Sequence, residues 1–153
     1  MYRLLIIALT FANALAETPV SRCKCGDSPF PTYVQIEGCD IQPCPIIKGT
    51  TGRFHLEFVA DFDAKNLTTN VVAKIFGMSV AYPVPDDQKY TCQHLLHGSY
   101  CPIYKGEDVS YVFELFIGTF YPEISLSVEV SVTDEKDRVL TCFSAAISVK
   151  KGE

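Results

Sequence analysis

The sequence has no tryptophan, and its 13 lysines and arginines are outnumbered by 18 aspartates and glutamates, which gives a formal net charge of −5. An acidic chain without a basic run argues against nucleic acid as a partner and against electrostatic docking on anionic membranes. The absence of tryptophan disfavours a true immunoglobulin domain, in which a core tryptophan packs on a disulfide between the sheets. We find no helical stripe, internal repeat or domain linker, and 153 residues fit a single domain.

The first residues have the pattern of a secretory signal peptide. Arg3 supplies a positive charge, residues 4–12 form an apolar run, and Ala14-Leu15-Ala16 is a small-x-small cleavage signal. The run is too short for a membrane span, which needs about 20 apolar residues, and no other stretch is long and apolar enough. We therefore expect a signal peptide over 1–16 and a single mature domain over 17–153. This domain would be secreted, into the extracellular space or the endosomal or lysosomal lumen.

Two further features agree with secretion. Seven cysteines are a high count for this length and indicate an oxidising compartment. Asn66-Leu67-Thr68 is a sequon, so Asn66 is predicted to carry an N-linked glycan.

Six segments have the pattern of β-strands, with alternating polar and apolar residues or many β-branched and aromatic side chains. They are residues 32–36, 53–63, 71–80, 111–117, 123–133 and 139–149. Turn-forming residues separate them, and one helical turn is expected near 94–99. This pattern predicts an all-β fold, an immunoglobulin-like antiparallel β-sandwich of two sheets with six to eight strands.

One short segment contains four potential zinc ligands, namely Cys92, His94, His97 and Cys101. Zinc would need both cysteines as thiolates, whereas a secreted chain favours a disulfide flanked by two loop histidines. We therefore predict no metal and no cofactor.

Nothing in the chain has the arrangement of an enzyme. His55, His94 and His97 have no companion Ser or Cys nucleophile in a recognisable arrangement, and there is no G-x-S-x-G elbow or phosphate-binding loop. The carboxylate pairs Asp61/Asp63 and Asp86/Asp87 and the charged turn at 134–138 are interpreted as solvated groups. The sequence therefore predicts a protein that is not an enzyme.

A series of short motifs between residues 25 and 149 resembles the ML lipid-recognition family. The motifs are Cys25-Gly26, Gly38-Cys39, Pro43-Cys44-Pro45-Ile46-Ile47-Lys48-Gly49, Tyr82-Pro83-Val84-Pro85, Cys101-Pro102-Ile103-Tyr104-Lys105-Gly106, Tyr121-Pro122 and Leu140-Thr141-Cys142. That family includes the small soluble Niemann-Pick type C sterol carriers, the group 2 mite allergens and a lipopolysaccharide co-receptor. Each motif is weak alone, but their common order along the chain is a strong signal.

The resemblance implies three disulfides, which spacing alone could not assign. They are Cys25–Cys142, Cys39–Cys44 and Cys92–Cys101. Cys23 is then the odd cysteine, and we favour a mobile N-terminal thiol. Cys23 could also carry a small thiol, link two copies of an otherwise monomeric chain, or replace Cys25 in the bridge.

The resemblance also implies a lipid site between the sheets. Its portal would be Tyr82, Ile117 and Tyr121, with Tyr82 on a stiff proline-containing loop. Tyrosine at position 82, where the sterol carriers have phenylalanine, adds a hydroxyl that favours a ligand with a polar end at the mouth. From strand alternation, the predicted cavity wall is Phe54, Leu56, Phe58, Phe62, Val71, Ile75, Phe113, Leu115, Val128 and Val130.

These expectations combine into a secreted lipid-binding and transfer protein that holds a sterol or fatty acid, with a membrane receptor or transporter as a further partner. An alternative is an innate-immune module that binds a microbial lipid and presents it to a receptor. A third interpretation is a sandwich with a filled core that acts only as a protein ligand.

Overall fold

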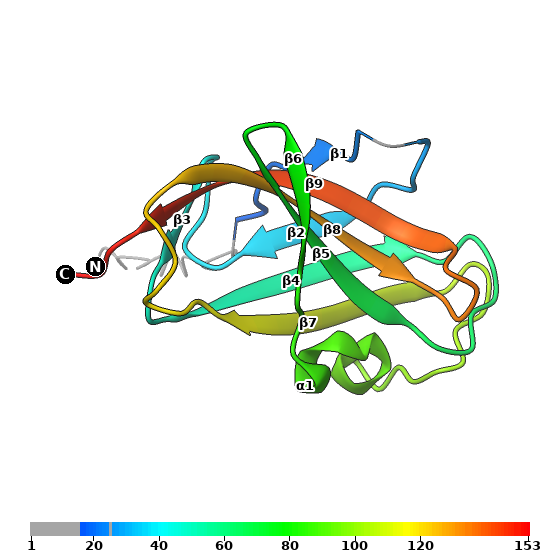
Figure 1. The fold of residues 1–153 in the computed structure, drawn as a ribbon. Coiled ribbons are helices and arrows are strands. Elements are labelled where there is room, and N and C mark those ends of the chain that lie inside the picture. The colour runs from blue at the N-terminus through cyan, green and yellow to red at the C-terminus, as the bar shows by residue number, and fades with distance from the viewer. Residues whose placement is uncertain (1–15, 25) are drawn as a thin grey trace, which may run out of the picture.

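The structure is a computed structural model that describes residues 16–24 and 26–153. The predicted signal peptide, except for Ala16, and Cys25 lie outside the described residues. Within this part of the chain, nine strands form two facing sheets, as Figure 1 shows. The predicted all-β sandwich is confirmed. None of the helices described is long and apolar enough to cross a membrane.

The larger sheet has the strand order β1-β9-β8-β5-β6, with β3 also paired to β9, and the smaller sheet has the order β2-β4-β7. The larger sheet contains β1 (Ser21–Arg22), β3 (Cys44–Ile47), β5 (Thr68–Ile75), β6 (Met78–Tyr82), β8 (Ser125–Thr133) and β9 (Val139–Lys150). The smaller sheet contains β2 (Tyr33–Ile36), β4 (Thr51–Val59) and β7 (Asp108–Phe116). Among these strands the pairings are antiparallel, except that β3 runs parallel to β9.

A short helical segment follows β6 and covers the edge of β7. It consists of α1 (Asp86–Lys89) and the 3-10 turn η1 (Thr91–His94). The side-chain oxygen of Gln88 accepts a hydrogen bond from the backbone N–H of Glu114 at 2.8 Å. This contact satisfies a donor that the edge of the smaller sheet would otherwise leave unpaired.

The strand predicted over 71–80 is a hairpin in the structure. Phe76 and Gly77 form the turn between β5 and β6, with φ angles of 50° and 78°. Two consecutive residues with positive φ match the twist of the flanking strands, but phenylalanine is rare in that conformation. Gly77 alone signalled the turn, and the hairpin is one reason why the structure has more strands than the predicted six to eight.

The aromatic side chains pack at one end of the space between the sheets. Phe54 and Phe113 stack with ring centroids 4.7 Å apart, and Tyr111 meets the edge of Phe58 at 6.5 Å. All four side chains are buried, as is Phe143 on the opposite sheet. Large rings fill this end, and Phe54 marks the border with the other end of the space between the sheets.

The three disulfides are Cys23–Cys142, Cys39–Cys44 and Cys92–Cys101. The expectation that Cys25 bridges to Cys142 is therefore wrong, and so are the free or intermolecular roles considered for Cys23. The reason is strand register. β1 pairs with β9 so that Arg22 lies opposite Phe143, and the next residue on each side is a cysteine.

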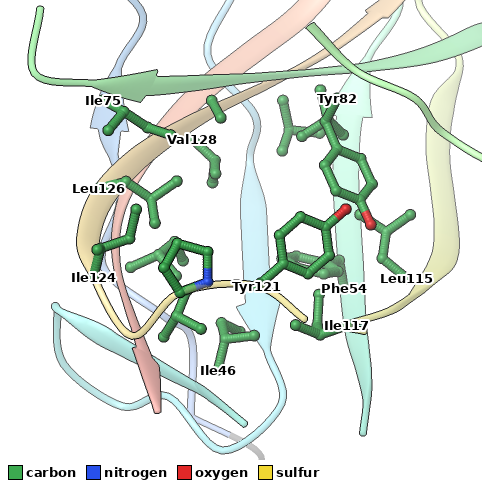
Figure 2. Close-up of a pocket in the computed structure, with 16 residues that line it drawn as sticks. Ile46, Phe54, Ile75, Tyr82, Leu115, Ile117, Tyr121, Ile124, Leu126 and Val128 are labelled. Atoms are coloured by element: carbon green, nitrogen blue, oxygen red, sulfur yellow. The ribbon is translucent and has the colours of Figure 1, made fainter. Parts of the chain in front are cut away.

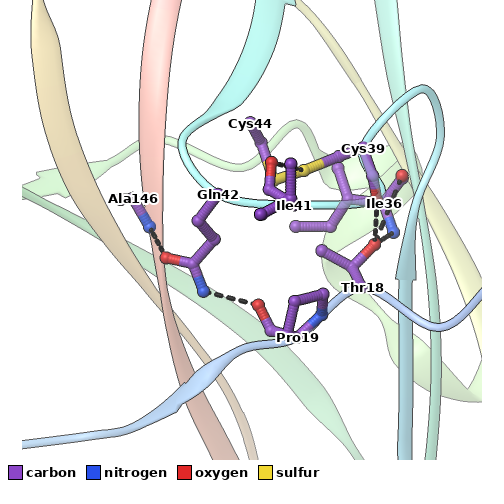
Figure 3. Close-up of a disulfide and its surroundings, with 8 residues drawn as sticks. All are labelled: Thr18, Pro19, Ile36, Cys39, Ile41, Gln42, Cys44 and Ala146. Carbon is purple, nitrogen blue, oxygen red and sulfur yellow. Dashed lines mark hydrogen bonds between the residues drawn. A yellow bond between two sulfur atoms is a disulfide. The ribbon is translucent and has the colours of Figure 1, made fainter.

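The N-terminal segment is held against the Cys39–Cys44 disulfide, as Figure 3 shows. The Thr18 hydroxyl accepts the backbone N–H of Ile36 at 2.9 Å and donates to the carbonyl of Cys39 at 2.6 Å. The Gln42 amide joins Pro19 to β9, because it donates to the Pro19 carbonyl and accepts the N–H of Ala146. Residues directly after the predicted cleavage site are thus part of the fold.

Candidate functional site

A cavity of about 170 Å³ lies between the sheets at the end where β7 ends and β8 begins. Figure 2 shows its side chains, which come from strands of both sheets and from the loop between β7 and β8. The sixteen lining residues are Ile46, Phe54, Val71, Ala73, Ile75, Tyr82, Leu115, Ile117, Tyr121, Pro122, Ile124, Leu126, Val128, Val130, Ile147 and Val149. All are apolar except for two tyrosines, so the space suits an apolar guest.

The size of the side chains explains why this end is hollow. The cavity side of β5 and β8 carries Val71, Ala73 and Val128, whereas the filled end has large rings. A sandwich closes only where side chains from both sheets meet across a gap of about 10 Å. Ala73 and Val128 remain half-buried although they point inward, which shows that the cavity opens to solvent.

Two tyrosines close one side of this opening. The rings of Tyr82 and Tyr121 lie 6.2 Å apart, and Figure 2 shows their hydroxyl oxygens next to each other. Burial, together with the hydrogen bond and charge of Tyr121, raises the pKa of Tyr82 to about 12. The Tyr82 hydroxyl is therefore protonated at physiological pH and lies 3.5 Å from the Phe116 carbonyl.

The loop between β7 and β8 is fixed at its first residue. The Ile117 N–H donates to the Thr50 carbonyl at 2.9 Å, and its carbonyl accepts the N–H of Gly49 at 2.6 Å. At Gly118, an added Cβ would clash with the Phe120 ring, which folds over the glycine. Ile117 is thus anchored to the smaller sheet, whereas Tyr82 ends an edge strand of the larger sheet.

Strand alternation predicted which side chains point between the sheets, but it did not predict which of them line the cavity and which are buried in the packed core. Of the ten predicted wall residues, Phe54, Val71, Ile75, Leu115, Val128 and Val130 line the cavity, as do the three predicted portal residues. Leu56, Phe58 and Phe113 also point inward, but they are buried in the filled end.

Phe62 is a different case. It lies beyond the end of β4, with its ring 4.1 Å from the guanidinium of Arg138. The alternation suggested that the strand continued through this position, but β4 ends at Val59. Phe62 is therefore outside the cavity wall.

Seven lining residues were absent from the predicted wall: Ile46, Ala73, Pro122, Ile124, Leu126, Ile147 and Val149. For Ile124 and Leu126 the signal was present, because both continue the inward alternation of Val128 and Val130. Ile46 had no such signal, because it reaches the cavity through the parallel pairing of β3 with β9. Sequence periodicity does not reveal which distant segments pair.

The charged turn at 134–138 differs from its predicted solvated state. Asp134 is 4% exposed, and its carboxylate accepts the N–H groups of Lys136 and Arg138 and the guanidinium of Arg138. Burial opposes the charge, but these donors outweigh it and lower the pKa of Asp134. The pair closes the β8–β9 hairpin, and its Arg138 guanidinium also contacts the Phe62 ring and the Asp63 carbonyl. None of these residues lines the cavity.

The remaining sequence candidates lie apart from the cavity wall. Cys92 and Cys101 form a disulfide, and the His94 ring contacts the carbonyl of Asp87 at 2.5 Å. His55 hydrogen-bonds to Ser110 at 2.9 Å on the smaller sheet. The side chain of Asn66 is exposed, which leaves its sequon open to modification.

Comparison with known proteins shows which family and which relatives this chain resembles. The family model for the ML domain matches residues 17–149. NPC intracellular cholesterol transporter 2 of Bos taurus is 29% identical over 153 residues, which cover 97% of this chain and 99% of that protein. Mite group 2 allergen Lep d 2 of Lepidoglyphus destructor is 30% identical over 104 residues, which cover 68% of this chain and 67% of that protein.

A solved structure shares the fold. A Niemann-Pick type C2 protein from the Japanese carpenter ant has a TM-score of 0.73 at 23% sequence identity, covering 82% of this chain and 96% of that one. The described sandwich therefore has the architecture of that protein.

Proposed function

Because the chain belongs to the ML domain family, and because its two sheets enclose an apolar cavity, we propose that it is a lipid-binding and transfer protein. The lipid, a sterol or fatty acid, is held between the sheets. The cavity is the observation that carries this proposal, because every lining side chain is apolar or aromatic. The function needs no covalent chemistry, only reversible burial of the lipid.

Burial of apolar surface supplies the binding energy. A lipid that buries about 400 Å² of apolar surface gains about 10 kcal/mol at about 25 cal/mol per Å². Loss of translational and rotational freedom on binding costs about 4 kcal/mol or more. Net binding thus follows from area alone, and shape sets most of the selectivity.

The lipid enters between Tyr82, Ile117 and Tyr121, and the cavity widens as it does so. A volume of about 170 Å³ is below the roughly 300–1,000 Å³ of ordinary ligand pockets. Ile117 is anchored by two backbone hydrogen bonds, so the movable side is the β5–β6 hairpin that carries Tyr82. β6 has a strand partner on one side only and is mostly exposed, which makes it the easier element to displace.

The protein acts as a secreted monomer in this proposal. Three disulfides suit an oxidising compartment, and the bond to Cys142 removes Cys23 as a link between copies. A membrane receptor or transporter is the partner from which lipid arrives or to which it is delivered.

The test places charge in the mouth. The double variant Tyr82→Asp and Ile117→Asp should lose lipid binding by more than about 100-fold, because carboxylates would have to be buried against the lipid without a cation. Binding is measured by displacement of a fluorescent sterol and a fluorescent fatty acid from delipidated protein. Circular dichroism reports whether the sandwich remains folded.

A matched control carries the same chemical changes elsewhere. Ile41 and Tyr100 are 76% and 77% exposed and do not line the cavity, so Ile41→Asp with Tyr100→Asp should bind lipid like the unmodified chain. Undiminished binding by the folded mouth variant, or equal loss in the control, would refute this site.

A further inference from the structure

The hydroxyls of Tyr82 and Tyr121 are the only polar side-chain atoms among the sixteen residues described around the cavity. Both lie at the mouth, where the two rings are 6.2 Å apart and the hydroxyl oxygens lie next to each other. One hydroxyl belongs to the last residue of β6 in the larger sheet. The other belongs to the loop that leaves β7 of the smaller sheet, so the pair joins the two sheets across the opening.

A guest that is a pure hydrocarbon leaves this pair as it is. A guest with a polar end at the mouth can hydrogen-bond to either tyrosine, because each phenol offers one O–H donor and oxygen lone pairs. The Phe116 carbonyl, 3.5 Å from the Tyr82 hydroxyl, supplies a further acceptor at the same place. Together these groups can both donate to and accept from a hydroxyl.

The mouth provides no positive charge for an ionised head. None of the lining residues is Lys, Arg or His. Lys48, which precedes the turn that anchors Ile117, has its ammonium 3.7 Å from the Glu123 carboxylate. An ionised carboxylate in the mouth would lose its hydration without gaining a cation, which is unfavourable.

We propose that Tyr82 and Tyr121 are specificity-determining residues that favour lipids with an uncharged hydroxyl at one end of an apolar body. The head lies beside the two tyrosine hydroxyls and hydrogen-bonds to them, while the apolar body fills the cavity. This inference rests on the proposed lipid-binding function and adds the class of lipid. Tyr82 is protonated near neutral pH because its pKa is about 12, so it is available there as a donor.

The experiment compares three probes of one chain length: tetradecane, 1-tetradecanol and myristate. Each displaces an uncharged fluorescent probe from the delipidated, disulfide-bonded chain at neutral pH, where the myristate carboxyl is ionised in water. The alcohol should bind more tightly than the alkane by roughly 2- to 10-fold for each hydrogen bond formed. Myristate should bind more weakly than the alcohol.

Phenylalanine variants distinguish the contribution of the tyrosine hydroxyls to binding from that of the rings. The double variant Tyr82→Phe and Tyr121→Phe should keep its affinity for the alkane and lose the preference for the alcohol. Tyr100→Phe, which removes a hydroxyl from an exposed ring outside the cavity wall, should keep that preference. The tyrosine absorption band should change on binding of the alcohol more than of the alkane, and only while Tyr82 and Tyr121 are present.

The outcomes distinguish the two proposals. If the unmodified chain binds alkane and alcohol equally, binds myristate as tightly as the alcohol, or keeps its preference in the double variant, the selectivity proposal is overturned and lipid binding stands. If the unmodified chain binds none of the probes, both proposals fail.

Discussion

Cys23 follows β1 and Cys142 lies within β9, and their Cα atoms are 5.9 Å apart. The pairing of Arg22 with Phe143 sets this position, and it leaves Cys25 as the unassigned cysteine. The bond joins residues separated by 119 positions, so it ties the N-terminal segment to the last strand.

Serine substitutions test the pairing. Cys23→Ser should lower the free energy of unfolding by about 2–4 kcal/mol, because a long loop is no longer closed in the unfolded chain. Cys25→Ser, two positions away, should change it little. Denaturant unfolding and peptide mapping without reduction measure both effects, and a peptide that links Cys25 to Cys142 in the unmodified protein would contradict the assignment.

Adjacent residues on β5 test where the cavity lies. Ala73 lines the cavity, whereas the side chain of Val72 points to the opposite face of the sheet. Ala73→Phe should fill the space and weaken lipid binding by more than about 10-fold, with a change in stability of about 3 kcal/mol or less. Val72→Phe, the matched control, should bind lipid normally. Equal binding by both variants would mean that the lipid sits elsewhere.

Thr18 tests the attachment of the N-terminal segment. Its hydroxyl is buried and both accepts from Ile36 and donates to Cys39, so valine would leave two backbone groups without their partner. Thr18→Val should lower the free energy of unfolding by about 1–3 kcal/mol. Thr18→Ser keeps the hydroxyl and should cost less. Thermal unfolding of the mature chain measures the difference, and a valine variant as stable as the serine variant would disprove the role of the hydroxyl.

Asp134 makes the stability of the β8–β9 hairpin depend on pH. Its pKa is lowered from 3.8 in the folded chain, so its stabilising contribution is present above the unfolded value and is lost as pH falls through the folded one. Asp134→Asn should cost about 1–3 kcal/mol at neutral pH. The difference in free energy of unfolding between this variant and the unmodified protein should stay constant down to about pH 5 and shrink below about pH 4.

The control for this prediction lies in the same turn. Asp137 is exposed and has a positive φ of 60°, a conformation that asparagine tolerates. Asp137→Asn should therefore leave both the stability at neutral pH and its acid dependence nearly unchanged. If Asp134→Asn remains less stable than the unmodified protein by the same amount in acid, the charge of Asp134 is not what stabilises the turn.

Much of the fold could be predicted from the chain itself. A period of two along residues 123–133 and the alternation of Phe54, Leu56 and Phe58 specify half-buried strands, because successive side chains on a strand point to opposite faces. The ordered short motifs predicted the ML family, which the family model confirms. Secretion, expected from the cysteine content and the apolar run at residues 4–12, stays a prediction. The three portal residues predicted from that resemblance do line the cavity.

Only the tertiary structure decided which side chains enclose the cavity and which fill the core. Periodicity assigns a face to Leu56, Phe58 and Leu115 alike, but Leu115 lines the cavity whereas the other two are buried in the packed core. The parallel pairing of β3 with β9, which brings Ile46 to the cavity, and the register that brings Cys23 to Cys142 join segments far apart in the chain. Local pattern carries little information on such pairings, because many registers satisfy the same alternation of faces.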